Sequence, residues 1–279
     1  MNNSEIDNLL NVALSFHKKG NLEKSENLYK KIIFINKENF YANHFLGTLY
    51  SQKKNYDDAI KYLEIGININ PNFSESYNNL GYVYYELNNI NESIKCLQKA
   101  VKLNPNYPDA FNNLGNSYLK IKKLKEAERN YLQTITIDNK NYNAFNNLGN
   151  LYFYIEEYSK AITNYKKAIS ININSINAYN NIANIFYFQN NNYDEAIKYF
   201  ELAIKYSPDF AKEKFLVKLD ECKKELDRNY LLEFITNTSV CAEIGVAYGN
   251  FSKRIINKNP KELHLVDSWD EGGLSKYIN

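Results

Sequence analysis

Asparagine residues recur in this chain at a spacing that places equivalent amides on successive segments. An amide side chain carries both a hydrogen-bond donor and an acceptor. A row of such side chains at a regular interval suits pairing with the backbone of an extended peptide, whatever the peptide's own side chains are. Asparagine is also abundant elsewhere, so a compositional origin stays open as the alternative. The column consists of Asn11, Asn79, Asn113, Asn147 and Asn181.

A second set of residues, near the end of the chain, has the types and order of a cofactor-binding turn. An apolar run, residues 240–244, leads into a segment with two glycines, and a second apolar run, residues 263–266, precedes an acid. Glycines at a strand end let a ligand approach the backbone, and an acid after the next strand can accept the ribose hydroxyls of an adenosine cofactor. The candidate residues are Glu243, Gly245, Gly249 and Asp267.

The asparagine column belongs to a longer pattern with a period of 34 residues. In most copies a small residue follows leucine or isoleucine and precedes an aromatic residue by three positions; these small residues are Gly47, Gly81, Gly115, Gly149 and Ala183. A second small residue comes 12 or 13 positions later, which predicts two helices in close approach. The second set is Ala59, Ser93, Ala127, Ala161 and Ala196.

These columns resemble the tetratricopeptide repeat family. Six units cover residues 6–210, and Phe45 stands where the other units have the column asparagine. The resemblance implies an all-α repeat solenoid of six helical hairpins, because a hairpin of this length buries its apolar face only against neighbours. It also implies a concave groove that binds a protein or an extended peptide.

The asparagine column resembles the asparagine ladder in the repeat array of protein O-linked N-acetylglucosamine transferases, which holds substrate chains in a concave groove. Only the repeats share this resemblance, so it implies the peptide-binding role without the sugar-transfer chemistry. Neighbouring asparagines would widen the polar lining. They are Asn78, Asn112, Asn146 and Asn180, together with Asn116, Asn150 and Asn184.

The sequence changes character after the sixth unit. Residues 211–236 place apolar side chains at helical spacing opposite a charged face, which predicts a helix that caps the array and links it to the C-terminal segment. Residues 237–279 predict a strand, a turn, a helix over residues 250–257 and a second strand. This is a short, incomplete α/β Rossmann-like unit.

The segment 237–279 resembles the start of class I S-adenosylmethionine-dependent methyltransferases, in the group whose first motif reads E-I-G-V and whose second strand ends L-V-D-S-W. The resemblance implies S-adenosylmethionine as a cofactor, with Glu243, Gly245 and Gly249 in its loop and Asp267 at the ribose. A dinucleotide-binding turn, which expects a tighter G-x-G-x-x-G, is the alternative. The segment is too short to be catalytic alone, and we identify no catalytic residues or metal ligands elsewhere in the sequence.

Charge and composition argue against other classes of function. Lysine and arginine total 34 against 32 acids, a net charge of +2, so the chain lacks the basic excess of a nucleic-acid-binding protein. No apolar run approaches the ~20 residues of a membrane span, and the beginning lacks an export leader. We therefore expect a cytoplasmic protein that binds neither nucleic acid nor membrane.

Two functions of different classes remain. The first is a protein- or peptide-binding scaffold that carries a truncated S-adenosylmethionine-binding motif. The second is a repeat-guided methyltransferase whose catalytic domain is completed by further sequence or by another chain. Binding of S-adenosylmethionine would favour the second function over the first.

Overall fold

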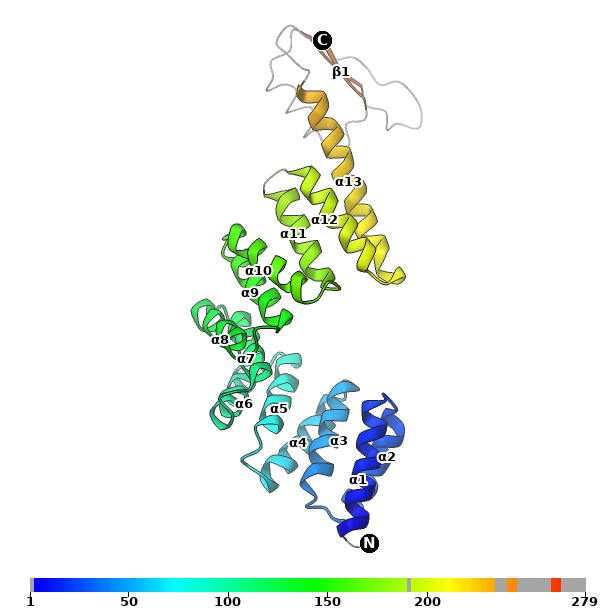
Figure 1. Ribbon diagram of the computed structural model, residues 1–279, viewed down its shortest axis with the longest axis vertical. Helices are drawn as coiled ribbons and strands as arrows, with labels where there is room; N and C mark the ends of the chain where they lie inside the picture. The colour runs from blue at the N-terminus through cyan, green and yellow to red at the C-terminus, as the bar shows by residue number, and fades with distance from the viewer. Residues whose placement is uncertain (1–2, 190–191, 234–239, 245–261, 267–279) are drawn as a thin grey trace. The chain divides into compact units, whose positions relative to one another are not determined.

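The computed structural model describes residues 3–189, 192–233, 240–244 and 262–266. The chain divides into two compact units, residues 1–172 and 173–279. The described part of the first unit is five helical hairpins in sequence (Figure 1). Their helices are α1 (Asn3–Lys18), α2 (Leu22–Ile35), α3 (Phe40–Gln52), α4 (Tyr56–Ile69), α5 (Ser74–Glu86), α6 (Ile90–Leu103), α7 (Pro108–Lys120), α8 (Leu124–Ile137), α9 (Tyr142–Tyr154) and α10 (Tyr158–Ile171).

The second unit contains the sixth hairpin, α11 (Ile176–Phe188) and α12 (Tyr193–Tyr206), and a long helix, α13 (Asp209–Glu233), which packs against α12. The described helices confirm the six predicted hairpins and the terminal helix. Helix α13 begins at Asp209 rather than at the expected 211, and the Ala211 N–H already donates to the Pro208 carbonyl (2.9 Å) in its first turn. Strands β1 (Val240–Ile244) and β2 (Glu262–Val266) pair in parallel, and the helix predicted between them lies outside the described residues.

Each hairpin closes around the small residues of the repeat. We call its first helix the A helix and its second the B helix. A Cβ atom added to Gly47 on α3 would lie 2.7 Å from Leu63 Cγ and 2.9 Å from the backbone nitrogen of Leu63 on α4. Ala59, which lies one turn before Leu63, is fully buried. The predicted close approach of the two helices is therefore confirmed.

The five A helices of the first unit end in a common turn that reverses the chain within three residues. After α3, the Asn55 N–H donates to the Tyr50 carbonyl (2.9 Å) and the Lys54 N–H to the Ser51 carbonyl (3.0 Å). This pattern is a Schellman motif, which requires a left-handed residue after the helix. The residues at that position with positive φ are Gly20, Lys54, Asn88, Lys122 and Glu156.

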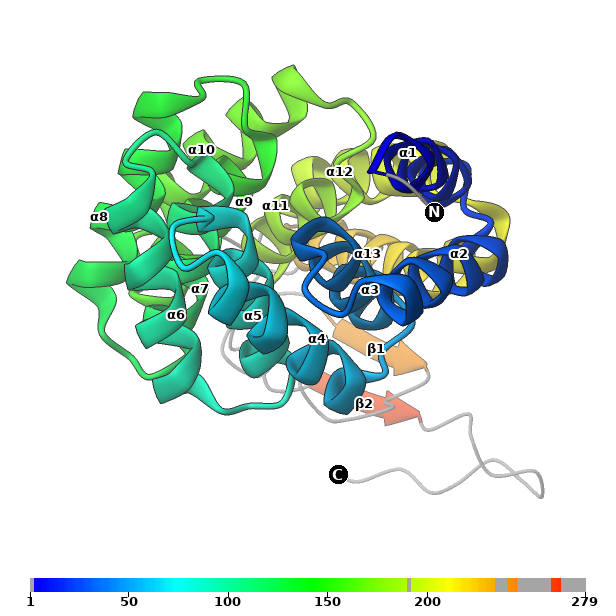
Figure 2. The same cartoon turned by 90° about the horizontal axis from the view of Figure 1, so that it is seen from below.

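Consecutive hairpins of the first unit stack so that the A helices lie on the inner side. Each A helix contacts the next A helix along the chain, whereas no comparable set of contacts joins consecutive B helices within residues 3–172. In Figure 2, α5, α7 and α9 accordingly lie inside the curve that α6, α8 and α10 follow. A side chain on the exposed face of an A helix therefore faces the concave side of this unit.

Many asparagines outside the predicted column cap helices and turns. Asn39 Oδ1 accepts the Ala42 N–H at 2.9 Å at the start of α3, as an N-cap does. In the loops after the B helices, Asn36 and Asn70 each accept the N–H two residues ahead, at 3.0 and 3.2 Å. Such Asx turns fix the link between hairpins. Part of the asparagine content is thus a structural requirement of the repeat.

Candidate functional site

The predicted asparagine column lies on the A helices, each residue in the middle of its helix. In the first unit, Asn79 on α5, Asn113 on α7 and Asn147 on α9 are partly exposed, and each precedes a buried leucine. Asn11 is exposed on α1. Asn181 lies on α11 and belongs to the second unit.

Amide side chains link one repeat to the next. Asn113 Nδ2 donates to Asn78 Oδ1 at 2.9 Å, and Asn147 Nδ2 donates to Asn112 Oδ1 at 3.1 Å. Both bonds join residues 35 positions apart on consecutive A helices. The two neighbouring asparagine columns therefore form one structure, which we call the amide row: Asn78, Asn112, Asn113 and Asn147.

In the preceding repeat, the corresponding asparagine donates to a different acceptor. His44 occupies the position that corresponds to Asn78, so Asn79 Nδ2 donates instead to Thr48 Oγ1 at 2.9 Å. The His44 ring is only 4% exposed, and its Nδ1 lies 2.8 Å from Ser76 Oγ. Burial lowers the pKa of His44 to about 4, so this histidine is neutral at neutral pH. It is a packing residue at the edge of the amide row.

Two of the four oxygen atoms of the amide row, those of Asn113 and Asn147, remain available to a ligand. Among the described residues, Oδ1 of Asn113 and Oδ1 of Asn147 receive no hydrogen bond, and neither atom is buried. Each can accept an N–H group from outside the protein. The amide bonds to Asn78 and Asn112 fix the orientation of these acceptors before any ligand arrives. The face thus presents two oriented acceptors, one per repeat.

The residues of a third asparagine column accept hydrogen bonds from side chains of neighbouring helices. The hydroxyl groups of Tyr131 and Tyr165, two buried tyrosines on B helices, donate to Asn116 Oδ1 and Asn150 Oδ1, each at 2.8 Å. In the second unit, Lys218 Nζ donates to Asn184 Oδ1 at 3.1 Å. Asn116 and Asn150 thus hold the tyrosines that pack against Gly115 and Gly149.

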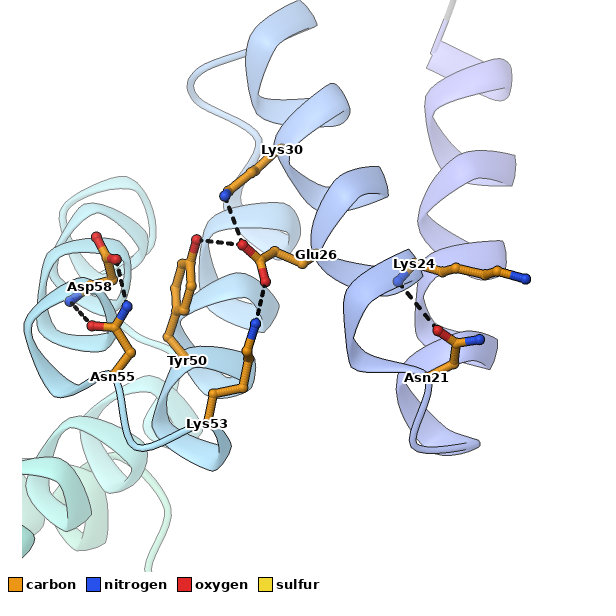
Figure 3. Close-up of polar contacts among 8 residues, drawn as sticks. All are labelled: Asn21, Lys24, Glu26, Lys30, Tyr50, Lys53, Asn55 and Asp58. Carbon is orange, nitrogen blue, oxygen red and sulfur yellow. Dashed lines mark hydrogen bonds and ion pairs between the residues drawn. The ribbon is translucent and has the colours of Figure 1, made fainter.

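Tyr50, the aromatic residue three positions after Gly47, takes part in a contact between two hairpins. Figure 3 shows Glu26 on α2 as the centre of a cluster, accepting from Lys30 Nζ (2.7 Å), Lys53 Nζ (2.7 Å) and the Tyr50 hydroxyl (3.0 Å). The hydrogen bond from Lys30 is the largest cause that lowers the pKa of Glu26 to about 2. These contacts join the first and second hairpins and stabilise their stacking.

The C-terminal candidates fall mostly outside the described residues. Glu243 lies in β1, opposite Leu265 of β2 in the parallel register. Gly245, Gly249 and Asp267 lie outside the residues that the structure describes. Within the described ranges, no group of three or more metal-ligating side chains occurs, and no helix combines the length and apolar character needed to cross a membrane.

Models of the tetratricopeptide repeat match the chain at the predicted period. One model, a TPR repeat, matches residues 81–122 and 149–187, and another matches residues 40–73, 108–141 and 176–210. A third matches residues 62–95. The chain contains tetratricopeptide repeats. The matches at residues 40–73 and 108–141 are each one predicted period long, and the match at residues 176–210 is one residue longer.

Solved structures of repeat proteins resemble this chain over most of their own length. MamA is 29% identical over 58% of this chain and 94% of its own, with a TM-score of 0.52. YrrB, described as a TPR protein with an unusual peptide-binding site, is 26% identical over 61% of this chain and 88% of its own, with a TM-score of 0.50. PilF of Pseudomonas aeruginosa, at 19% identity, 76% and 97% coverage and a TM-score of 0.62, shows the fold alone. No curated protein matches the chain.

These comparisons support a tetratricopeptide repeat scaffold. They do not bear on the resemblance to O-linked N-acetylglucosamine transferases, on the methyltransferase-like segment or on a cytoplasmic location. Those three points stay predictions.

Proposed function

We propose that the A-helix face of the first unit binds an extended peptide segment of a partner protein. Oδ1 of Asn113 and Oδ1 of Asn147 accept hydrogen bonds from backbone N–H groups of that segment. The observation that carries the proposal is that both oxygens are open while their amides are fixed by bonds to Asn78 and Asn112. This extends to our chain the role expected from the asparagine ladder.

Recognition through backbone groups has consequences for affinity and specificity. Each net hydrogen bond contributes about 1 kcal/mol, so two amides supply about 2 kcal/mol. Because the amides are already oriented by the protein, little side-chain freedom is lost on binding. A backbone contact does not depend on the ligand's side chains, so the face accepts many sequences in the same extended conformation. The peptide-binding site named for YrrB supports this type of ligand.

A peptide chosen from a random display library against the full chain provides the probe, and fluorescence anisotropy measures its affinity. The double variant Asn113→Ala/Asn147→Ala removes both acceptors and is expected to weaken binding roughly 10- to 30-fold. The same change removes two bonds between repeats, so thermal unfolding is recorded alongside and binding is measured well below the melting temperature.

A matched control uses two asparagines of the B helices. Asn130 Nδ2 bonds to the Glu126 carbonyl and Asn164 Nδ2 to the Lys160 carbonyl, each within its own helix. Asn130→Ala/Asn164→Ala should leave the affinity unchanged. Equal losses in both double variants, or no loss in either, would contradict the proposal.

We further propose that residues 237–279 bind S-adenosylmethionine, with Glu243, Gly245 and Gly249 in the cofactor loop and Asp267 at the ribose. The parallel pairing of β1 and β2 supports this, because parallel neighbours need a crossover connection, and residues 245–261 are long enough to supply one. In Rossmann-like units the cofactor loop follows the first strand and the ribose acid follows the second. A repeat-guided methyltransferase completed by other sequence stays the alternative to a pure scaffold.

Titration calorimetry with S-adenosylmethionine and with its demethylated product tests this second proposal. Micromolar binding that Asp267→Ala abolishes would support it. The absence of measurable heat with either compound would leave the peptide-binding scaffold as the function of the chain.

A further inference from the structure

A cavity of about 590 Å³ opens between the first two hairpins, away from the amide row. It lies in the first unit, between B helices α2 and α4 and the start of α3. Its walls combine apolar and cationic side chains with one buried amide. The residues that matter to its chemistry are Phe34, Lys37, Asn43, Lys61, Tyr62 and Ile65.

The cavity occupies the place of an aromatic ring that other repeats possess. Asn43 stands at the position where the later units have Tyr77, Phe111, Phe145 and Tyr179. In the next hairpin, Lys99 Nζ lies 6.0 Å from the centre of the Tyr77 ring, and Lys99 is the counterpart of Ile65. In that hairpin the Tyr77 ring therefore lies beside the counterpart of Ile65, where the second hairpin has only the short side chain of Asn43.

Apolar residues at the cavity also depart from the repeat pattern. Phe34 is 87% exposed, and Ile65 lies on the cavity wall. A residue that the repeat fold requires should recur in every unit. Phe34 and Ile65 do not recur, so the repeat fold does not account for them. The counterparts of Phe34 are Asn68, Lys102, Thr136 and Ser170, and those of Ile65 are Lys99, Gln133 and Lys167.

Two lysines give the cavity a positive charge that the protein does not neutralise. Among the described residues, neither Lys37 nor Lys61 has a carboxylate within ion-pairing distance. Lys37 replaces the proline that closes several other units, and Lys61 Nζ lies 5.2 Å from the centre of the Tyr62 ring. A ligand with carboxylates would be attracted to this site.

The amide of Asn43 lacks one partner. Its side chain is 1% exposed, and Nδ2 donates to the Lys37 carbonyl (3.0 Å) and the Asn39 carbonyl (2.9 Å). Oδ1 has no hydrogen-bond partner in the described part of the chain. A buried acceptor without a donor is unfavourable, and a donor on a ligand would relieve this.

We propose that this cavity is a second docking site, which takes a tyrosine side chain from an acidic segment of a partner protein. The ligand ring occupies the place of the missing ring, against Phe34 and Ile65. Its hydroxyl donates to Asn43 Oδ1, and flanking carboxylates pair with Lys37 and Lys61. The site uses no residue of the amide row, so it stands or falls independently of the peptide-binding face.

The probe is a fluorescent peptide with the sequence Glu-Asp-Glu-Tyr-Asp-Glu, titrated with the full chain at low salt. Asn43→Phe restores the ring that the other units have and should weaken binding at least tenfold without lowering the melting temperature. Replacing the peptide tyrosine by alanine should have a similar effect. Lys37→Glu/Lys61→Glu should also weaken binding at least tenfold and reduce its dependence on salt.

A matched pair of lysines in later repeats provides the control. Lys99→Glu/Lys167→Glu alters the net charge by the same amount, but at the counterparts of Ile65 in later repeats. It should leave the affinity for the peptide unchanged. The proposal is overturned if Asn43→Phe or the alanine peptide binds as well as the parent pair. It is also overturned if inorganic phosphate displaces the peptide at equal concentration, because the site would then recognise small anions alone. Should Asn43→Phe fail to fold, the lysine variant and the alanine peptide still decide.

Discussion

The smallest side chains of the A helices set how close the two helices of a hairpin lie. A Cβ atom on Gly115 would lie 2.6 Å from Tyr131 Cε1 and 2.7 Å from Tyr131 Cδ1. The Tyr131 ring is fully buried and its hydroxyl is bonded to Asn116, so it has little room to move. We therefore expect Gly115→Ala to lower the free energy of unfolding by about 2 kcal/mol, as measured by urea denaturation.

Gly66→Ala is the opposite case and serves as the control. The nearest atom to its added Cβ would be the His44 backbone nitrogen at 3.6 Å, which is ordinary contact. Because Gly66 lies inside α4, alanine should stabilise the protein by about 0.5–1 kcal/mol. If Gly115→Ala and Gly66→Ala destabilised the protein equally, close contact with the B helix would not explain why residue 115 is glycine.

The cluster around Glu26 predicts a dependence of stability on acid pH. Its folded-state pKa of about 2 lies below the ordinary value of 4.5, so the contribution of this carboxylate is complete above pH 4.5 and is lost as the pH falls toward 2. Glu26→Gln should cost about 1 kcal/mol at neutral pH and flatten the decline between pH 4.5 and 2, recorded as urea midpoints. Glu92→Gln removes only the exposed ion pair with Lys95. It should change neither the free energy of unfolding at neutral pH nor the decline of the urea midpoint at acid pH.

Helix ends provide the test at the scale of elements. Lys122 follows α7 with a φ of 59°, in the left-handed region that glycine adopts most readily. Lys122→Gly should raise the free energy of unfolding by about 1 kcal/mol, because the turn keeps its hydrogen bonds and loses its backbone strain. Lys166→Gly, in the interior of α10, should lower it by about the same amount. A higher melting temperature for Lys122→Gly and a lower one for Lys166→Gly would support the turn geometry.

The order and length of the helices could be predicted from the sequence, because a 34-residue period fixes where each hairpin turns. The chain reversal after each A helix was harder to recognise, since Lys54, Lys122 and Glu156 replace the usual glycine. The asparagine column was visible, but the bond from Asn113 to Asn78 depends on how one hairpin stacks on the next. The replacement of an aromatic residue by Asn43 can be seen in the sequence, whereas the cavity beside it depends on how the first two hairpins pack.

At the scale of the whole molecule, the repeats account for residues 6–210, and the segment 237–279 has a separate proposed role. The first unit carries the amide row and the cavity beside Asn43, and the second carries the sixth hairpin, α13 and the parallel strand pair. The near-neutral charge fits a protein that recognises partners by local chemistry rather than by a general field. A cofactor-binding role rests on residues at the ends of the two strands, and calorimetry is its test.

Side-chain amide spectra of the protein, recorded while a library-derived peptide is added, test the central claim most directly. Binding of backbone N–H groups to Asn113 Oδ1 and Asn147 Oδ1 should shift the Nδ2 resonances of these two residues in proportion to occupancy. The resonances of Asn130 and Asn164 on the B helices should stay in place. Saturation of the protein with peptide while the Asn113 and Asn147 resonances remain unmoved would contradict the account.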